Sequence, residues 1–592
     1  MAKKVIILGG GVAGMSAAHE LIERGFEVEV HERMAHYVGG KARSIEVPGS
    51  AIEGYKLLPG EHGFRFFPGF YRHVTDTMSR IPLADKPGKT VYDNLVVSRQ
   101  SIQAQIGEVP IIVPSRFPST EKELRQIIAS ISETHKQFTK EEDELIFNTL
   151  WRVLTTCKER KNDEYERISW WNFTEAANHS YAYQQLFVIG LSRTLVAARA
   201  EEISAKTEGD ILLQLMSLIA RPGGRADQVL NGPTNEAWLY PWRDYLLSKG
   251  VVYQHGSVAT KIHYDGQKKQ IAGVDVQNAA GDISTVSGDY YIFAVPVEQM
   301  APLVKGETHL LKDEPVLNQL EQLAQSTDWM SGIQFFLSEK VPMLDTTEGH
   351  VIYFETPWAL TSISQLQFWE GFDISQYGNG QVKSILSVDI SNWNNPGLLE
   401  WERNGVKTKL KANDCTREEI RQEVWYQLQQ CLMVDGKPLL KNQDEILIDW
   451  YLDRDISFEP DKDPHKAKVL ANREPLLINK VNTWGMRPNA VTAISNLFLA
   501  SDYVRTFTDL ATMEGANEAA RRAVNGIIAA SNSKAPYCGV WDLHYSNSTA
   551  VLRWVDKMRY ERGEPWKNEI PFMYAVVHRV SLFLQWLFGV KA

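Results

Sequence analysis

The chain has few cysteines and no surplus of positive charge, and each absence excludes a class of protein. Its 592 residues include four cysteines, which show no CxxC or other metal-ligand spacing: Cys157, Cys415, Cys431 and Cys538. So few, separated thiols argue against a disulfide framework and a metal site, and they favour a reducing, cytoplasmic compartment. Lys and Arg total 63 against 73 Asp and Glu, a net charge of -10. Nucleic acid, whose phosphates require a basic surface, is therefore not expected as a partner.

Long apolar runs are also scarce. The first, from Val5, follows two lysines and enters a glycine-rich turn rather than a cleavage site, which predicts a strand and not a signal peptide. The most apolar segment is 570–592, but His578, Arg579 and Gln585 interrupt it, whereas a spanning helix needs roughly 20 apolar residues. Two predictions stay open for this segment: an interfacial helix in peripheral contact with a membrane, or a helix packed on the body or on a second subunit.

The first 32 residues carry the strongest motif. An apolar strand at 5–8 enters a turn with Gly9, Gly11 and Gly14, and a helix and a second strand follow up to the acid Glu32. Gly9 permits the tight turn, Gly11 lets backbone amides approach a pyrophosphate, and Gly14 allows close packing of helix and sheet. Because an acid at the end of the second strand accepts hydrogen bonds from ribose hydroxyls and disfavours a 2′-phosphate, we expect FAD or NAD rather than NADP.

A second glycine pair decides between FAD and NAD. Residues 39–44 read GGKARS, so two glycines and a cation follow the acid at short range. We interpret this loop as a second phosphate contact, which favours FAD.

With these motifs the sequence resembles the flavin amine oxidase and carotenoid (phytoene) desaturase superfamily, and it fits the desaturase branch better. The resemblance covers under half of the chain and continues in LPGEHGFRFFPGFYRH at 58–73, in 230–262, in GDYYIFAVP at 288–296 and in the segment 497–527, which contains MEGA. It implies that 58–73 passes near the flavin ring, that the backbone of Val258 holds the adenine, and that Asp502 and the amides of 513–516 contact the ribityl chain and the pyrimidine edge of the flavin.

Together, motif and resemblance imply a cofactor site built from both ends of the chain. Its predicted members are Gly9, Gly11, Val12, Ala13, Gly14, Glu32, Arg33, Gly39, Gly40, Lys41, Ala42, Arg43, Gly60, Glu61, His62, Gly63, Val258, Asp502, Met513, Glu514, Gly515 and Ala516. Glu61, His62 and Arg65 are the candidate catalytic residues, because they lie in the segment expected beside the flavin and a histidine titrates near neutrality. The alternative is that all three only fix the flavin or the loop.

The fold class that follows is α/β, with a Rossmann-type FAD-binding domain of the glutathione-reductase type, a mixed α+β substrate domain and a helical insertion. Apolar residues at three-to-four spacing near 145–154 predict helices at 120–220, and β-branched runs at 251–253, 270–276 and 290–295 predict a meander. The predicted segments are 1–75, 228–300 and 491–532 for the FAD-binding domain, 76–227 for the largely helical insertion, 301–490 for the substrate domain, and 533–592 for a C-terminal extension.

The predicted function is FAD-dependent oxidation, as a desaturase or dehydrogenase, of an isoprenoid or other lipid-like substrate, with a quinone or oxygen as electron acceptor. The 17 tryptophans, among them Trp170, Trp171, Trp238, Trp242 and Trp393, form the core or line an apolar tunnel. The alternatives are an amine or amino-acid oxidase, a flavin-dependent isomerase or hydratase of fatty-acid double bonds, and a non-catalytic lipid-escort protein of the same fold.

Overall fold

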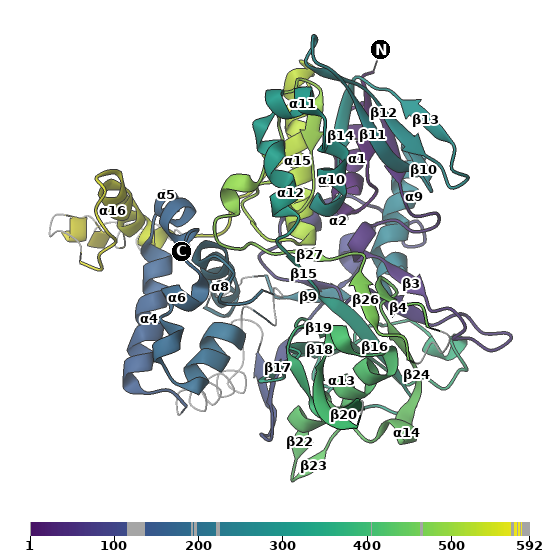
Figure 1. The fold of residues 1–592 in the computed structure, drawn as a ribbon, viewed down its shortest axis with the longest axis vertical. Coiled ribbons are helices and arrows are strands. Elements are labelled where there is room, and N and C mark those ends of the chain that lie inside the picture. The colour runs from purple at the N-terminus through teal and green to yellow at the C-terminus, as the bar shows by residue number, and fades with distance from the viewer. Residues whose placement is uncertain are drawn as a thin grey trace.

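The structure is a computed structural model that describes residues 2–114, 137–190, 193, 198–220, 225–403, 405–461, 466–569, 574–576, 578, 579 and 582. Three lobes make up this part of the chain (Figure 1). A Rossmann lobe, built from distant segments of the chain, lies above a sheet lobe, and a helical lobe projects to one side. Residues of all three lobes line one cavity, which is the candidate functional site.

Five parallel strands from three distant segments form the sheet of the Rossmann lobe. Their order is β10 (Val252–His255), β2 (Glu27–Glu32), β1 (Lys4–Leu8), β14 (Tyr290–Phe293) and β28 (Leu497–Leu499). β14 and nearly all of β1 are buried, as expected for parallel strands covered on both faces. Helices α1 (Val12–Ile22) and α15 (Met513–Ala530) pack against each other beside this sheet, so two segments that are far apart in the sequence meet there (Figure 1).

The predicted meander at 251–253, 270–276 and 290–295 is wrong in its pairing. The first and third runs become β10 and β14 of the Rossmann sheet, whereas the antiparallel meander consists of β11 (Val258–Asp265), β12 (Gln270–Gln277) and β13 (Ile283–Val286). β14 is buried along its whole length, while β13 is largely exposed. Periodicity identified strands here but could not identify their partners.

A seven-stranded sheet is the centre of the sheet lobe. Its order is β24 (Leu447–Leu452), β16 (Ser331–Leu337), β19 (Ser384–Ile390), β18 (Leu360–Ser364), β17 (Gly349–Phe354), β7 (Gln100–Gln105) and β8 (Ile111–Pro114). β7 and β8 lie in the segment 76–227, which was predicted to be largely helical, so that prediction fails at its start. In β7, buried Ile102 and Ala104 alternate with partly exposed residues, which is the period of a strand. The other limits of the six segments stay predictions.

The helical lobe contains α4 (Lys140–Thr155), α6 (Trp170–Phe173) and α8 (Ala205–Ala220). α4 contains the residues whose spacing predicted a helix, and a capping box starts it: Glu142 donates its amide to the Thr139 hydroxyl at 3.2 Å, and Thr139 donates its amide to the Glu142 carboxylate at 2.8 Å. The C-terminal α16 (Ala550–Glu561) joins this lobe through Arg160 and Asp556, whose Nε and Oδ1 atoms lie 3.0 Å apart.

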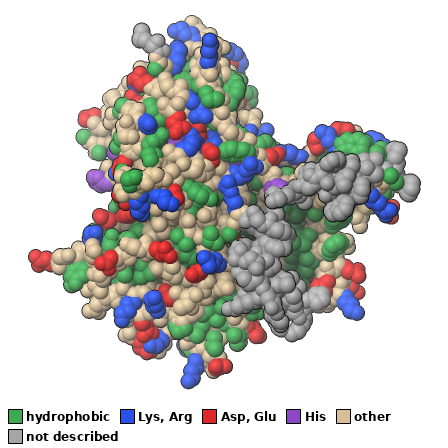
Figure 2. Space-filling model, turned by 180° about the vertical axis from the view of Figure 1, so that it is seen from behind, with side chains coloured by type: hydrophobic (Ala, Val, Ile, Leu, Met, Phe, Trp, Pro, Cys, Tyr) green, Lys and Arg blue, Asp and Glu red, His purple; other side chains and the backbone are tan. Residues whose placement is uncertain are grey.

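Most of the predicted apolar segment 570–592 lies outside the described residues, and so does the part of 120–220 before residue 137. Among the helices that are described, none is both long and apolar enough to cross a membrane. Lys and Arg side chains alternate with Asp and Glu side chains over the face of the molecule shown in Figure 2.

Candidate functional site

A cavity of about 440 Å³ lies where the three lobes meet. Its cofactor half is lined by the Rossmann lobe, including residues 501–516, and its substrate half by residues 62–71, α8 and the sheet lobe. Seventeen predicted residues line it: Gly9, Gly11, Val12, Ala13, Glu32, Arg33, Gly39, Gly40, Lys41, Ala42, His62, Gly63, Arg65, Val258, Asp502, Met513 and Ala516. Gly14, Arg43, Gly60, Glu61, Glu514 and Gly515 do not.

The glycine turn after β1 forms one wall of the cofactor half. Gly9 has a φ of +104°, and a Cβ on Gly14 would lie 1.9 Å from the Gly9 carbonyl oxygen, so neither position accepts a side chain without a shift of the backbone. Gly11 precedes α1, and no side chain caps this helix. The uncapped N-terminus therefore presents free N–H groups and a positive dipole end to the cavity at Val12 and Ala13. These groups fit the pyrophosphate of a dinucleotide.

Glu32 is held in place beside the turn. Its Oε2 accepts the Gly10 amide and its Oε1 accepts the Met34 amide, both at 2.7 Å. Burial raises the pKa of Glu32, although the two amides oppose this shift. Each oxygen keeps a further lone pair, so the buried carboxylate can accept hydrogen bonds from ribose hydroxyls as the motif predicts.

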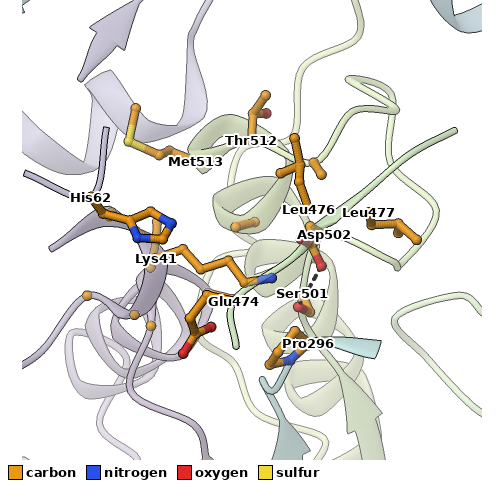
Figure 3. A pocket seen from close by; sticks show the side chains of 18 of the residues that line it. Lys41, His62, Pro296, Glu474, Leu476, Leu477, Ser501, Asp502, Thr512 and Met513 are labelled. Carbon is orange, nitrogen blue, oxygen red and sulfur yellow. Dashed lines mark hydrogen bonds between the residues drawn. The ribbon is translucent and has the colours of Figure 1, made fainter. Parts of the chain in front are cut away.

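Two cations between β2 and the end of the second glycine loop, Arg33 and Lys41, form ion pairs beside the cavity. Lys41 crosses the cavity towards Ser501 and Asp502 (Figure 3), and its Nζ lies 3.1 Å from Glu298 Oε1. Burial opposes the charge of Lys41, but the pKa is raised overall by Glu298, Asp502 and Glu474. Arg33 lies 2.5 Å from Glu474, which lines the cavity from the sheet lobe and which no sequence motif indicated.

The C-terminal segment forms the opposite wall. Ser501 donates its hydroxyl to Asp502 at 3.1 Å, and both residues line the cavity (Figure 3). Thr512 starts α15: its hydroxyl accepts the Gly515 amide at 3.1 Å and its carbonyl accepts the Ala516 amide at 2.9 Å. Of the four amides predicted to face the flavin, those of Gly515 and Ala516 are therefore already satisfied.

Glu514 turns away from the cavity, and its side chain has a structural role. Its carboxylate accepts the backbone amides of Arg72, His73 and Val74 at 2.7 to 2.9 Å, at the start of α2 (His73–Met78). It also lies 2.7 Å from Nδ1 of His73, whose Nε2 accepts the Trp541 amide. Burial alone would raise the pKa of Glu514, but these hydrogen bonds from His73 and Val74 lower it. Glu514 thus caps α2 and ties it to α15.

The three candidate catalytic residues occupy different surroundings. Glu61 does not line the cavity. Its carboxylate accepts hydrogen bonds from the amide and the hydroxyl of Thr234, at 3.0 and 2.8 Å. Burial raises the pKa of Glu61 to about 7. His62 lines the cavity, with Nδ1 2.6 Å from Asp453 Oδ2. Burial opposes its charge, but Asp453 raises the pKa of His62 to about 9. Arg65 lines the substrate half.

Several residues of the substrate half were not predicted. They are Phe64, Phe66, Phe70, Tyr71, Ile211, Leu215, Met330, His350, Thr361 and Asp389. Thr361 on β18 pairs with Asp389 on β19, and Asp389 pairs with Gly332 on β16, so one row of the sheet forms the floor. A buried aspartate inside the otherwise uncharged strand SILSVDI was the one available signal, because such a group is rarely buried without a role. None of the five tryptophans considered above lines this cavity.

Comparison with known proteins agrees with this geometry. A family model described as flavin containing amine oxidoreductase matches residues 12–528. The zeta-carotene desaturase of Synechocystis sp. is 21% identical over 545 residues, which span 89% of this chain and 97% of the desaturase. The 4,4'-diaponeurosporene oxygenase of Staphylococcus haemolyticus is 45% identical over 85 residues, 14% of this chain and 17% of the oxygenase.

Solved structures show the same fold. A putrescine oxidase superposes with a TM-score of 0.56 at 12% identity, covering 89% of this chain and 99% of its own. An oxidoreductase from Methanosarcina mazei superposes with a TM-score of 0.53 at 12% identity, covering 89% of this chain and all of its own.

Proposed function

Because the chain belongs to the family of flavin containing amine oxidoreductases, we propose that it is a desaturase or dehydrogenase of an isoprenoid or other lipid-like substrate. The family match confirms the predicted resemblance, the Rossmann-type fold and the FAD cofactor, and the chain is an FAD-dependent oxidoreductase. FAD, when bound, supplies the hydride acceptor. The substrate class is the part that we propose.

One observation carries the proposal: the cofactor half continues directly into a substrate half whose walls are largely apolar. Phe64, Phe66 and Phe70 contribute aromatic rings, and Ile211 and Leu215 of α8 contribute aliphatic side chains. Such walls bind hydrocarbon by removing it from water, and they exclude water from the reacting end. The near full-length similarity to a carotene desaturase supports the same substrate class.

The chain's own residues perform the remaining tasks. The N-terminus of α1 and Lys41 can balance the charge of the phosphates, and Glu32 can accept hydrogen bonds from the ribose. At the boundary of the cofactor half and the substrate half, the pair of His62 and Asp453 keeps a proton on an imidazole that faces the cavity. Such a cation suits a site in which negative charge develops.

The electron acceptor, a quinone or oxygen, and peripheral membrane contact through 570–592 also belong to the proposal. An apolar substrate must be drawn from a lipid phase, and that segment has the composition of an interfacial helix. No described feature favours nucleic acid as a partner.

The test is anaerobic reduction of the FAD-loaded protein. We expect the visible absorbance of the oxidised flavin to fade with an isoprenoid or fatty substrate and not with primary amines. Leu215→Trp should fill the substrate half and abolish reduction without changing the FAD content, whereas Met216→Trp, at a neighbouring position that is 41% exposed, should leave both unchanged.

The alternatives give different results. Reduction by amines or amino acids would identify an oxidase of those compounds. Conversion of a fatty-acid double bond without net electron transfer would identify an isomerase or hydratase. A colourless protein that binds prenyl lipids would identify an escort protein.

A further inference from the structure

The substrate half contains an arginine with buried nitrogens that find no hydrogen-bond partner among the described residues. Arg65 lines the cavity, and its Nε and Nη2 atoms are buried without a hydrogen bond. Among the described residues, no carboxylate oxygen lies within 4.0 Å of its guanidinium nitrogens. A buried charge without a hydrogen-bonded partner is costly. The guanidinium stays protonated at any physiological pH, because burial lowers the pKa of Arg65 while Glu61, Asp389 and Asp453 oppose this shift. The arginine therefore calls for an anion from outside the described chain.

The nearby acids do not supply this anion. Glu61 is held by Thr234, and burial raises the pKa of both Glu61 and Asp389 to about 7. Asp389 is packed against the backbone of residue 63, where a Cβ on Gly63 would lie 2.9 Å from Asp389 Oδ1. The charges of both acids favour the protonated form of Arg65, but both are partly protonated near neutral pH, and neither lies within ion-pair distance of its guanidinium.

Two further polar residues of the substrate half, His350 and Thr361, are uncharged. Phe66 follows Arg65, and its ring centroid lies 4.8 Å from that of His350, which is buried on β17 with an unpaired Nδ1. Burial lowers the pKa of His350 to about 4, so it is neutral. Thr361 lies on the adjacent strand β18 and offers a hydroxyl. The cavity therefore combines an arginine with unpaired nitrogens, a protonated His62 that is already paired with Asp453, and neutral polar groups within apolar walls.

We propose that Arg65 anchors a carboxylate at one end of the substrate, which makes the substrate an apolar acid rather than a pure hydrocarbon. This inference rests on the proposed function. A planar carboxylate matches the fork of the guanidinium, and the free nitrogens allow a charge-assisted pair. The neutral His350 and Thr361 can complete the hydrogen bonds of the carboxylate. The phenyl and aliphatic walls then hold the chain of the acid.

The experiment uses the FAD-loaded full-length protein and measures the change in flavin absorbance on titration with dodecanoate, dodecanol, methyl dodecanoate and dodecylamine. Dodecanoate should bind about 10- to 100-fold tighter than the alcohol or the ester, as expected for hydrogen bonds to a charged group, and the amine should bind weakest. Arg65→Met should remove this preference, and Arg65→Lys should restore part of it. Arg99→Met, at an exposed arginine, is the control for loss of charge.

The inference would be overturned if the four ligands bound equally, if the amine bound best, or if Arg65→Met abolished FAD binding in folded protein, because the arginine would then serve the cofactor. The ligand series with the unaltered protein decides the matter even if both variants fail to fold. Failure of the proposed function looks different, since the protein would then lack FAD or would not be reduced by any lipid.

Discussion

The two halves of the cavity recognise their ligands by different means. In the cofactor half, the chain uses its backbone: a glycine turn, the free amides of α1 and a carboxylate held by two amides. In the substrate half it uses side chains from residues 62–71, α8 and strands β17 to β19, and several of their polar atoms are unpaired. Backbone recognition needs particular residues at a fixed local spacing, whereas side-chain recognition needs only that distant residues meet. The halves should therefore respond differently to substitution.

The largest effect is expected in the cofactor half, at Gly14. Gly14→Val places a Cβ 1.9 Å from the Gly9 carbonyl oxygen, so the turn and α1 must separate. Overpacking of this kind costs about 1–3 kcal/mol or more, equivalent to a loss of about 5- to 150-fold in FAD affinity if the strain falls on the bound conformation. The measurement is the ratio of flavin to protein after purification. Gly485→Ala is the control, because its Cβ would meet nothing within 4 Å; full FAD content in Gly14→Val would contradict the account.

This difference between the halves also explains how much the sequence could predict. The turn, Glu32, the 39–42 loop and the start of α15 follow from short motifs, and all have residues that line the cavity. The predicted contact of the Glu514 amide with the flavin stays a prediction, and the motif could not show that the side chain of Glu514 caps α2. His350, Thr361 and Asp389 lie on three strands whose pairing depends on tertiary packing, so no local spacing marks them.

At the boundary of the two halves, His62 should make stability depend on pH. In the folded protein the pKa of His62 is raised to about 9, whereas in the unfolded chain it is about 6.5. The protonated histidine therefore contributes fully to the free energy of unfolding below pH 6.5, and this contribution is lost as the pH rises through about 9. The shift corresponds to about 3 kcal/mol at most. The free energy of unfolding in urea should therefore fall over this range in the unaltered protein and less steeply in His62→Gln. His36→Gln, at an exposed histidine, should keep the original slope, and equal slopes in all three proteins would refute the ion pair.

Glu514 offers a test of whether a motif residue acts on the cofactor or on the fold. Glu514→Gln weakens the hydrogen bonds to α2 and His73, so we expect a loss of about 1–3 kcal/mol in the free energy of unfolding. FAD affinity of the folded protein should stay unchanged, since the carboxylate does not line the cavity. Thermal unfolding and flavin titration measure the two quantities separately, with the exposed Glu561→Gln as control. A selective loss of FAD affinity would restore Glu514 to the cofactor site.

The smallest effect is expected in the substrate half, at His350. His350→Phe replaces a buried ring whose Nδ1 has no partner by a ring of similar size, so the free energy of unfolding should change by less than about 1 kcal/mol at neutral pH. FAD affinity should also stay the same, because His350 comes from β17 in the sheet lobe while the turn and amides of the cofactor half are untouched. The control is Thr361→Val on the neighbouring strand, which removes a hydroxyl from the same floor. If His350→Phe weakened FAD binding as strongly as Gly14→Val, the two halves would be one recognition site, and the division between backbone and side-chain recognition would fail.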